Sequence, residues 1–372
     1  MMPPHAKPLT DLDEAWRAPS AGERLSMMRR RAPGLRDRVL QSGRVIAVRT
    51  FDVGPLPYPT RFGFAGAATS PVPYLMMTNR ATLVQFETDA GETKTLLFNP
   101  TDAVRSLETP YFKEIRRKMG DFISDRVQAA VVRPKPHEQL PSVGLSPEDI
   151  DYIAFDHLHT QDLRASLGGA SDGAVLAPYF PRAKLLVWRP ELDIFRELHP
   201  LQSYWYIPDG VRGITSDRFL VCDGDVLLGR GVALVRTPGH TVGNWSLVIN
   251  TDRGVWAVSE NGIACDSYAP EASKIPGLRK WARGSGGEVV LNSNTLELRN
   301  EQYTSMVLEK LLVDRCPDAP EFYQHFPSSE LTPSPLTPGL SPTYRHRAIV
   351  SGEIRRRATR SDAVGVARQP NA

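Results

Sequence analysis

The sequence predicts an α/β fold, and two patterns support this class. Short apolar runs rich in β-forming residues recur between residues 45 and 258, at the usual length of strands. Stretches with apolar residues at helical spacing lie among and after them, at 103–140, 190–196 and 301–313. With 372 residues, 41% of them hydrophobic and 23% charged, the chain is expected to form a soluble globular protein with ample core material.

Charge and composition exclude several classes of protein. The net charge of +3 is too small to indicate a nucleic-acid partner, and no run of eighteen apolar residues predicts a membrane span. Cys222, Cys265 and Cys316 are an odd, widely spaced set without a CxxC motif, which is typical of a reducing compartment without disulfides. We therefore expect a cytoplasmic protein. The sequence leaves the oligomeric state open.

Residues 1–43 are predicted to form an N-terminal extension. The basic run 29–31 is not followed by an apolar segment of seven or more, so a secretory signal is not expected. Residues 11–16 and 23–28 predict short helices packed on the domain as a lid or a surface arm.

The first strands are predicted at 45–51, 81–86 and 94–98. A stretch rich in Pro, Gly and aromatic residues, 54–74, separates the first two. It is longer than an ordinary connection, and loops of this length are either functional or packed Ω-loops.

The densest group of metal-type ligands lies at 156–162, with the sequence Asp-His-Leu-His-Thr-Gln-Asp. It follows the predicted strand 150–155, and side chains alternate along a strand, so His157 and His159 point to the same side. Two imidazoles, with Asp162 as a possible carboxylate, indicate a zinc or iron site. The alternative is a pair of solvent-exposed histidines at a strand end.

A third imidazole comes from residues 237–241, Thr-Pro-Gly-His-Thr, between the strand-like runs 231–236 and 245–249. Pro-Gly forces a turn where the first of these runs stops. His240 is therefore presented from a loop at a sheet edge, as His157 and His159 are.

This order of motifs, His157-x-His159 and then Pro-Gly-His240 some eighty residues later, resembles the metallo-β-lactamase superfamily. The similarity is specific over about 145–262 and looser over 44–144 and 263–312. It implies an αββα sandwich over 44–326, preceded by the extension 1–43 and followed by the segment 327–372.

The chain departs from the family pattern in its second-metal half. Gln161 stands where the family has Asp, Asp162 where it has the next His, and Glu260 where it has the bridging Asp. The loop in which the last family His is expected offers only the amides of Asn292 and Asn294. The resemblance thus implies one metal rather than two, with the candidate ligands His157, His159, His240, Asp162 and Glu260.

The resemblance also implies positions for the pocket walls. The stretch 54–74 would overhang the metal, and the turn 99–102 would shape the floor of the site. The aromatic loop 201–217 is expected either to wall the pocket or to pack on the surface. Candidate substrate contacts in the overhanging stretch are Tyr58, Phe62, Phe64 and Tyr74.

A zinc ion with three protein ligands keeps a position open for water and lowers the pKa of that water towards about 7. Together with this chemistry, the resemblance implies a hydrolase with a small-molecule substrate, in which metal-bound hydroxide attacks an ester, lactone, thioester or amide. Asp162 or Glu260 would orient the water or take its proton. Two alternatives remain: an iron oxygenase similar to persulfide dioxygenases, with a site of His157, His240 and Glu260, and a scaffold of the same fold that has lost catalysis.

The segment 327–372 is rich in Ser, Thr and Pro and ends in an Arg-rich stretch. This composition predicts a disordered, solvated tail, or a tail that binds an anionic partner. His325, directly before it, could fold back and replace the missing family His.

Overall fold

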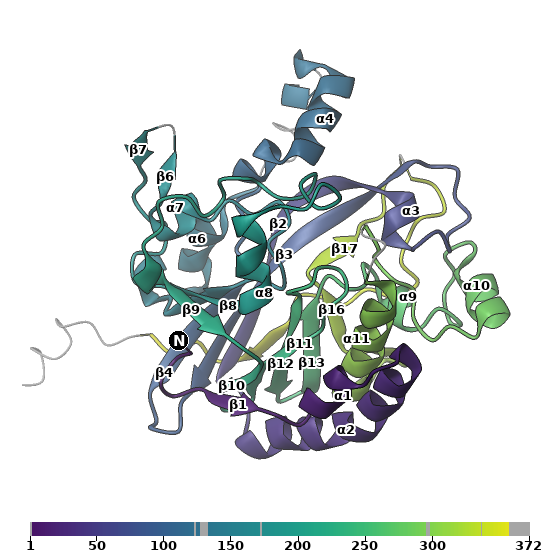
Figure 1. Cartoon of the computed structure of the whole chain (residues 1–372), viewed down its shortest axis with the longest axis horizontal. Coiled ribbons are helices and arrows are strands. Elements are labelled where there is room, and N and C mark those ends of the chain that lie inside the picture. The colour runs from purple at the N-terminus through teal and green to yellow at the C-terminus, as the bar shows by residue number, and fades with distance from the viewer. Residues whose placement is uncertain are drawn as a thin grey trace, which may run out of the picture.

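Two β-sheets face each other at the centre of the molecule (Figure 1). The computed structural model describes residues 2–122, 124–126, 133–171, 173–294, 298–335 and 337–356. The eight-stranded sheet has the order β18 (Val350–Gly352), β2 (Ala47–Pro59), β3 (Tyr74–Glu87), β4 (Thr93–Phe98), β5 (Tyr152–Ala154), β8 (Lys184–Trp188) and β9 (Phe219–Cys222), and β17 (Ser329–Leu331) pairs with β3. The six-stranded sheet has the order β1 (Lys7–Leu9), β10 (Asp225–Gly229), β11 (Val232–Arg236), β12 (Trp245–Thr251), β13 (Gly254–Ser259) and β16 (His325–Pro327).

Successive apolar side chains of the strands in the first sheet point alternately to its inner and its outer face. Val84 and Leu96 belong to the cluster between the two sheets. Their neighbours Leu83 and Leu97 belong to the cluster on the outer face of the first sheet. Because successive side chains of a strand point to opposite faces, apolar runs such as these require a layer of helices on the outside.

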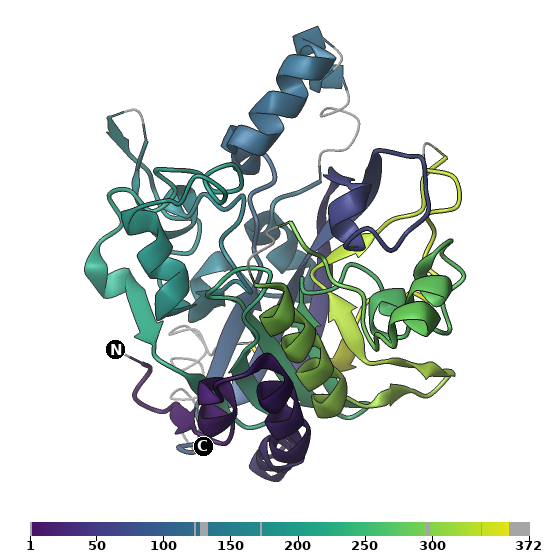
Figure 2. The same cartoon turned by 45° about the vertical axis from the view of Figure 1, so that its right-hand side comes forward.

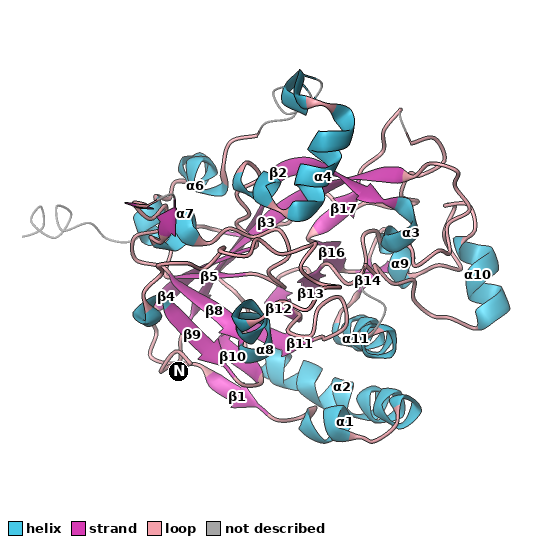
Figure 3. Cartoon of the chain, turned by 45° about the horizontal axis from the view of Figure 1, so that its top comes forward, coloured by secondary structure: helices cyan, strands magenta, loops and turns pink. Residues whose placement is uncertain are grey.

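The second sheet is covered by α1 (Asp13–Arg17), α2 (Ala21–Ser42) and α11 (Arg299–Leu312). Leu35 of α2 and Leu308 of α11 share one buried cluster with Val235 and Val248 of the sheet. The Ser20 side chain accepts a hydrogen bond from the Glu23 amide and so caps the start of α2. The predicted N-terminal extension is therefore part of the domain: β1 is an edge strand of the second sheet, and α1 and α2 cover that sheet, as Figure 3 shows.

Helices also cover the outer face of the first sheet, which completes the αββα sandwich predicted from the sequence. The predicted helical region 103–140 contains α4, which stands out from the body of the domain (Figure 2). Two apolar positions expected there, 123 and 127, lie outside the described residues. The helices on this side are α3 (Thr60–Gly63), α4 (Pro110–Met119), α6 (Pro136–Gln139), α7 (Arg164–Leu167) and α8 (Arg189–Asp193).

Smaller elements complete the chain. Single 3-10 turns occur at Arg105–Glu108, Leu140–Val143, Pro147–Asp149, Ile194–Arg196 and Ser216–Arg218. The remaining elements are the hairpins β6 (Ala170–Ser171) with β7 (Ala174–Val175) and β14 (Arg315–Cys316) with β15 (Ala319–Tyr323), and the helices α9 (Cys265–Tyr268) and α10 (Leu278–Ser285). No described helix is both long enough and apolar enough to cross a membrane.

The stretch 54–74 differs from the loop expected from its composition. Strands β2 and β3 continue through it as a paired ribbon up to Pro59, which pairs with Tyr74. On its other edge, β2 pairs with β18 only over residues Ala47 to Arg49. Beyond that point no strand of the described residues lies beside this edge of β2, and prolines are tolerated on an unpaired edge because no ladder hydrogen bond is lost there.

The expected boundary at residue 327 is also wrong for the described part of the C-terminal segment. Residues 329–331 pair with β3 and residues 350–352 pair with β2. Leu331, Leu340 and Ile349 are buried in the domain. Composition predicted disorder because Ser, Thr and Pro are frequent here. The segment is nevertheless held in place by these three buried side chains and by its pairing with β2 and β3.

A truncation tests the C-terminal segment. We expect deletion after Phe326 to lower the free energy of unfolding by more than about 5 kcal/mol, because it removes two strand pairings and several buried side chains. Denaturant unfolding of the truncated chain would measure this. Truncation after Arg356, which keeps every described contact of the segment, is the reference. Equal stability of the two proteins would show that the segment contributes nothing.

Candidate metal centre

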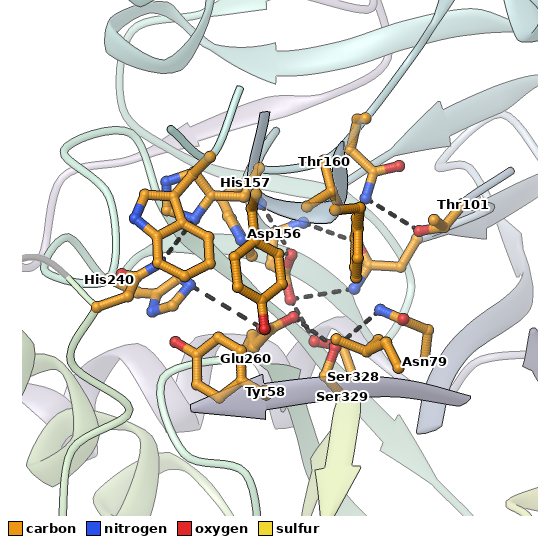
Figure 4. A pocket seen from close by; sticks show the side chains of 18 residues that line it. Tyr58, Asn79, Thr101, Asp156, His157, Thr160, His240, Glu260, Ser328 and Ser329 are labelled. Carbon is orange, nitrogen blue, oxygen red and sulfur yellow. Dashed lines mark hydrogen bonds and ion pairs between the residues drawn. The ribbon is translucent and has the colours of Figure 1, made fainter. Parts of the chain in front are cut away.

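Three histidines converge at the ends of strands from both sheets. His157 and His159 follow β5, and His240 follows β11. Their ring centroids lie 4.7 Å, 4.5 Å and 5.1 Å apart for the pairs 157–159, 157–240 and 159–240. One nitrogen from each ring lies within 4.8 Å of the others, and all three side chains are buried. The structure thus brings together the three imidazoles that the sequence predicted. Figure 4 labels two of them, His157 and His240, in the pocket that they line.

The carboxylate of Asp156 orients His157. Its Oδ1 accepts hydrogen bonds from the His157 amide and from His157 Nδ1, both at 2.8 Å. Its Oδ2 accepts from Asn99 Nδ2 at 3.0 Å and from the hydroxyl of Ser328. A carboxylate on Nδ1 fixes the ring so that Nε2 is the nitrogen left to face the site.

The turn that carries His240 requires glycine. Gly239 has φ 145°, and a Cβ at this position would lie 2.2 Å from the backbone of Gln302. This close contact against α11 places His240 Nδ1 2.9 Å from the carbonyl oxygen of Asn292, to which it donates. Gln302 Nε2 donates to the same oxygen at 2.6 Å, so the imidazole is held from behind.

A buried glutamate joins the loops of the site. Glu191 Oε1 accepts from the Leu158 amide at 2.7 Å and from the Tyr206 hydroxyl at 2.9 Å. Its Oε2 accepts from the Thr241 hydroxyl at 2.7 Å. The loops that carry His159, Trp205 and His240 are therefore fastened to one carboxylate.

Burial and charge set the protonation of the three imidazoles. Burial, together with the neighbouring histidines, lowers the pKa of His159 well below its usual value. Burial and the charge on His157 lower the pKa of His240 to about 3. Burial acts in the same direction on His157, but the Asp156 carboxylate outweighs it and raises that pKa to about 9. His159 and His240 are thus neutral at pH 7, the form that binds a metal.

Glu260 lies beside the histidines at the end of β13. Its Oε1 is 4.0 Å from His240 Nε2, and its Oε2 accepts from the Ser329 hydroxyl at 2.5 Å. Burial, opposed by the charge of His157, raises the pKa of this carboxyl group to about 7. Asp156, His157 and Glu260 form a second group of metal-type ligands that shares His157 with the first.

The structure places Asp162 away from the histidines. Its two oxygens accept from Arg164 Nε at 2.8 Å and Nη2 at 2.7 Å, and Arg105 Nε lies 3.3 Å away. Thr160, with φ 61°, turns the chain between His159 and Asp162, an unusual backbone conformation for a β-branched residue. Asp162 belongs to neither group of metal-type ligands found among the described residues.

Of the other residues expected near the site, some line the pocket and others lie outside it. Asn294 Nδ2 lies 3.3 Å from His159 Nδ1, whereas His325 is buried on Tyr268 and hydrogen-bonds to Ser259. Tyr58 and Trp205 line the pocket with the histidines, as do Asn99 and Thr101 of the predicted floor. Of the remaining aromatic candidates, Phe62 packs beside Trp205 and Phe64 is in the core, while Tyr74 is exposed at the end of the β2–β3 ribbon.

Four residues that shape the site were not predicted from the sequence. Glu191 lies in the short helix α8, and nothing in the surrounding sequence predicts that its side chain is buried. Ser328 and Ser329 sit in the segment whose composition predicted disorder, yet they follow β16, which runs parallel to β13 and ends beside Glu260. Asp156 had a usable signal, because it directly precedes His157 in the metal motif.

Comparisons with known proteins agree with the motif. An N-acyl homoserine lactonase from a Bacillus species is 32% identical over 114 residues, which are 31% of this chain and 38% of the lactonase. No family model matches the sequence. The resemblance to the metallo-β-lactamase superfamily therefore rests on its motifs, on the αββα sandwich and on this partial relative.

Solved structures overlap the chain loosely. A probable metal-dependent hydrolase from Staphylococcus aureus is 15% identical with a TM-score of 0.47, over 70% of this chain and 82% of that one. AidC, a dizinc quorum-quenching lactonase in complex with a product, is 14% identical with a TM-score of 0.47, over 83% and 95%. At these scores the overlaps add nothing to what the strand order already shows.

The two arginines beside Asp162 lead to a prediction. Asp162→Asn should lower the free energy of unfolding by on the order of 2 kcal/mol, because two largely buried guanidinium groups lose their anion. Bound metal and turnover should change little. Asp209→Asn, which removes an exposed acid that is also paired with an arginine, is the matched control. A hundredfold loss of turnover with unchanged stability would instead identify Asp162 as a general base.

Proposed function

We propose that this chain is a metal-dependent hydrolase that holds one zinc ion through His157, His159 and His240. The convergence of three buried imidazoles carries this proposal. Three nitrogen ligands, with a further position left for water, are the donor set of catalytic zinc.

The ring of His159 supports the fit of a metal. Its Nε2 is buried and has no hydrogen-bond partner among the described residues, which is costly for a polar atom unless something binds it. The amide of Asn294 is the neighbour of Nδ1, and its own Oδ1 is also buried without a described partner. With oxygen and nitrogen of this amide exchanged, Nδ1 donates to Oδ1 and Nε2 keeps its lone pair for a metal.

A zinc ion in this site would supply an activated water molecule at neutral pH. Glu260 is the residue of the chain best placed to orient that water and to accept its proton. Its Oε2 is anchored by Ser329, while Oε1 lies on the side of His240. Asp156 has no such freedom, because both of its oxygens are occupied, and it acts through His157.

Tyr58 is proposed as the hydrogen-bond donor to the substrate. Its hydroxyl is buried, lines the metal pocket and has no described hydrogen-bond partner. Burial, reinforced by the charge of Glu260, raises the pKa of Tyr58 well above its usual value, so the hydroxyl keeps its proton. A donor fixed in this way can stabilise the negative charge that develops on a carbonyl oxygen under attack.

The proposed substrates are carboxylic esters, lactones, thioesters or amides. A lactone is the first to assay, since the partial relative is named an N-acyl homoserine lactonase. Fold alone does not define the substrate, and the pocket residues differ from chain to chain in such folds.

Metal analysis and hydrolysis assays test the proposal together. Protein purified without added metal should contain about one zinc per chain, and a chelator should lower its melting temperature, because the metal binds only the folded state. The double variant His157→Ala, His240→Ala should lose the zinc, the chelator effect and lactone or ester hydrolysis. His199→Ala, which changes an exposed histidine, is the control.

Three results would redirect the assignment. Iron together with oxygen uptake would favour the oxygenase, in which His157, His240 and Glu260 bind the metal. Absence of any metal would favour a scaffold. Two zinc ions per chain would contradict the single site.

The role of Tyr58 has its own test. Tyr58→Phe should lower kcat by about a hundredfold to a thousandfold, as loss of one oxyanion donor does, with zinc content preserved. Tyr111→Phe is the comparison, because the Tyr111 hydroxyl in the same pocket already donates to the Pro57 carbonyl. We expect a much smaller effect there. An equal effect of both substitutions on kcat would show that Tyr58 only packs.

A further inference from the structure

Two hollows of the molecule share a wall. The metal pocket and a larger groove are both lined by Leu56 of β2, Thr101, Phe112 of α4 and Thr160. The groove, here called the α4 groove, lies between the β2–β3 ribbon and the helix α4. Its cavity volume is about 180 Å³, and it opens to solvent. A molecule bound in it can therefore reach the histidines without leaving the surface of the protein.

The α4 groove is lined mainly by apolar side chains. Two of them, Val104 and Met119, are 44% and 38% exposed, high for large apolar side chains. Exposed apolar surface that is continuous with a hollow indicates a binding site rather than ordinary surface. The lining residues on which the argument rests are Leu56, Met76, Ala103, Leu107, Phe112 and Ile115.

The polar groups at the inner end of the groove are already paired. Asn79 Nδ2 donates to the Ser329 hydroxyl, and Thr101 accepts from Gln161 Nε2. At the outer rim, Arg116 is paired with Asp121 and Asp125. Of the other polar side chains that line the groove, Arg133 is exposed and the Ser124 hydroxyl has no described partner. The inner end of the groove therefore offers little to a polar ligand, and the part of the occupant next to the metal pocket is apolar.

We propose that the α4 groove holds the aliphatic acyl chain of the substrate while its ester or lactone carbonyl lies in the metal pocket. This inference rests on the proposed hydrolase function and adds to it the chemical class of the substrate. Phe112 at the shared wall and Met119 at the rim are seven residues apart on α4, about 10 Å along the helix axis. The groove thus fits an unbranched chain of medium length.

A series of p-nitrophenyl alkanoates from acetate to dodecanoate tests chain length. We expect kcat/KM to rise about threefold to fourfold with each added methylene and then to level off when the chain outgrows the groove, because each methylene leaves water for apolar contacts. Binding is measured separately, by calorimetric titration of the protein with decanoate and with butyrate. Decanoate should bind more tightly and with a negative heat-capacity change.

Two substitutions in the groove sharpen the test. Ile115→Asp places a charge on its wall and should lower both decanoate affinity and the ratio of kcat/KM for decanoate ester over acetate ester, by tenfold or more. Ala103→Phe fills the groove and should shift the plateau to shorter chains. Val175→Asp, at a position 85% exposed on the β6–β7 hairpin, introduces the same charge elsewhere and should leave the ratio unchanged.

The outcomes separate the groove from the hydrolase. Hydrolysis that does not depend on chain length, together with equal binding of decanoate and butyrate, would overturn the groove while the hydrolase stands. If decanoate binds and this binding is lost in Ile115→Asp, but no ester or lactone is hydrolysed, acyl-chain binding in the α4 groove would be supported and the hydrolase function would be contradicted. Unchanged decanoate affinity in both groove variants would overturn the inference.

Discussion

The carboxylate of Glu191 is the contact on which the geometry of the site depends. Burying a carboxylate is unfavourable unless hydrogen bonds replace its hydration. Here an amide and two hydroxyls do so, from Leu158, Tyr206 and Thr241. Each donor lies on a different loop, and two of these loops carry the histidines. Because charge-assisted hydrogen bonds are strong and directional, one buried charge fixes the relative positions of loops from both sheets.

The closeness of the packing around Glu191 adds to this constraint. A Cβ at Gly243 would lie 2.3 Å from atoms of Glu191, so the turn after His240 lies directly against the helix that carries the glutamate. On the other side of the same turn, Gly239 meets Gln302 of α11. The loop of His240 is thus clamped between α8 and α11, and the imidazole is held in position before any metal binds, which lowers the cost of ordering the site.

Local patterns predicted the central strands and the three histidines, but they did not predict contacts between residues that are distant in the sequence. Strand-length apolar runs located β4 and β5 within a few residues but missed the continuation of β2 and β3 through 54–74. The positions of His157, His159 and His240 at strand ends followed from alternation and from a Pro-Gly turn. Ser328 reaches Asp156 across 172 positions of sequence, and no local pattern signals such a contact. Composition was misleading after residue 327 because an average over Ser, Thr and Pro conceals single buried residues such as Leu331.

The residues at the positions expected to bind a second metal form a hydrogen-bonded wall. Gln161 donates to Thr101, and Asp162 is taken by Arg164 and Arg105. Ser328 and Ser329, which follow the strand parallel to β13, donate to the carboxylates of Asp156 and Glu260. Zinc favours nitrogen and sulfur over hydroxyl and amide groups, so this wall competes poorly with the three imidazoles for a metal.

The hydrogen bonds of this wall leave the carboxylates of Asp156 and Glu260 in different environments. Asp156 accepts hydrogen bonds at both oxygens and so influences the site only by making His157 a more basic ligand. Glu260 is anchored at Oε2 alone, and its Oε1 stays on the side of the histidines. In the proposed hydrolase, the carboxylate behind the ligands would help to hold the metal, and the one that faces the pocket would accept the proton. One metal and one proton acceptor would then suffice for hydrolysis, so the proposed mechanism needs no ligands for a second metal.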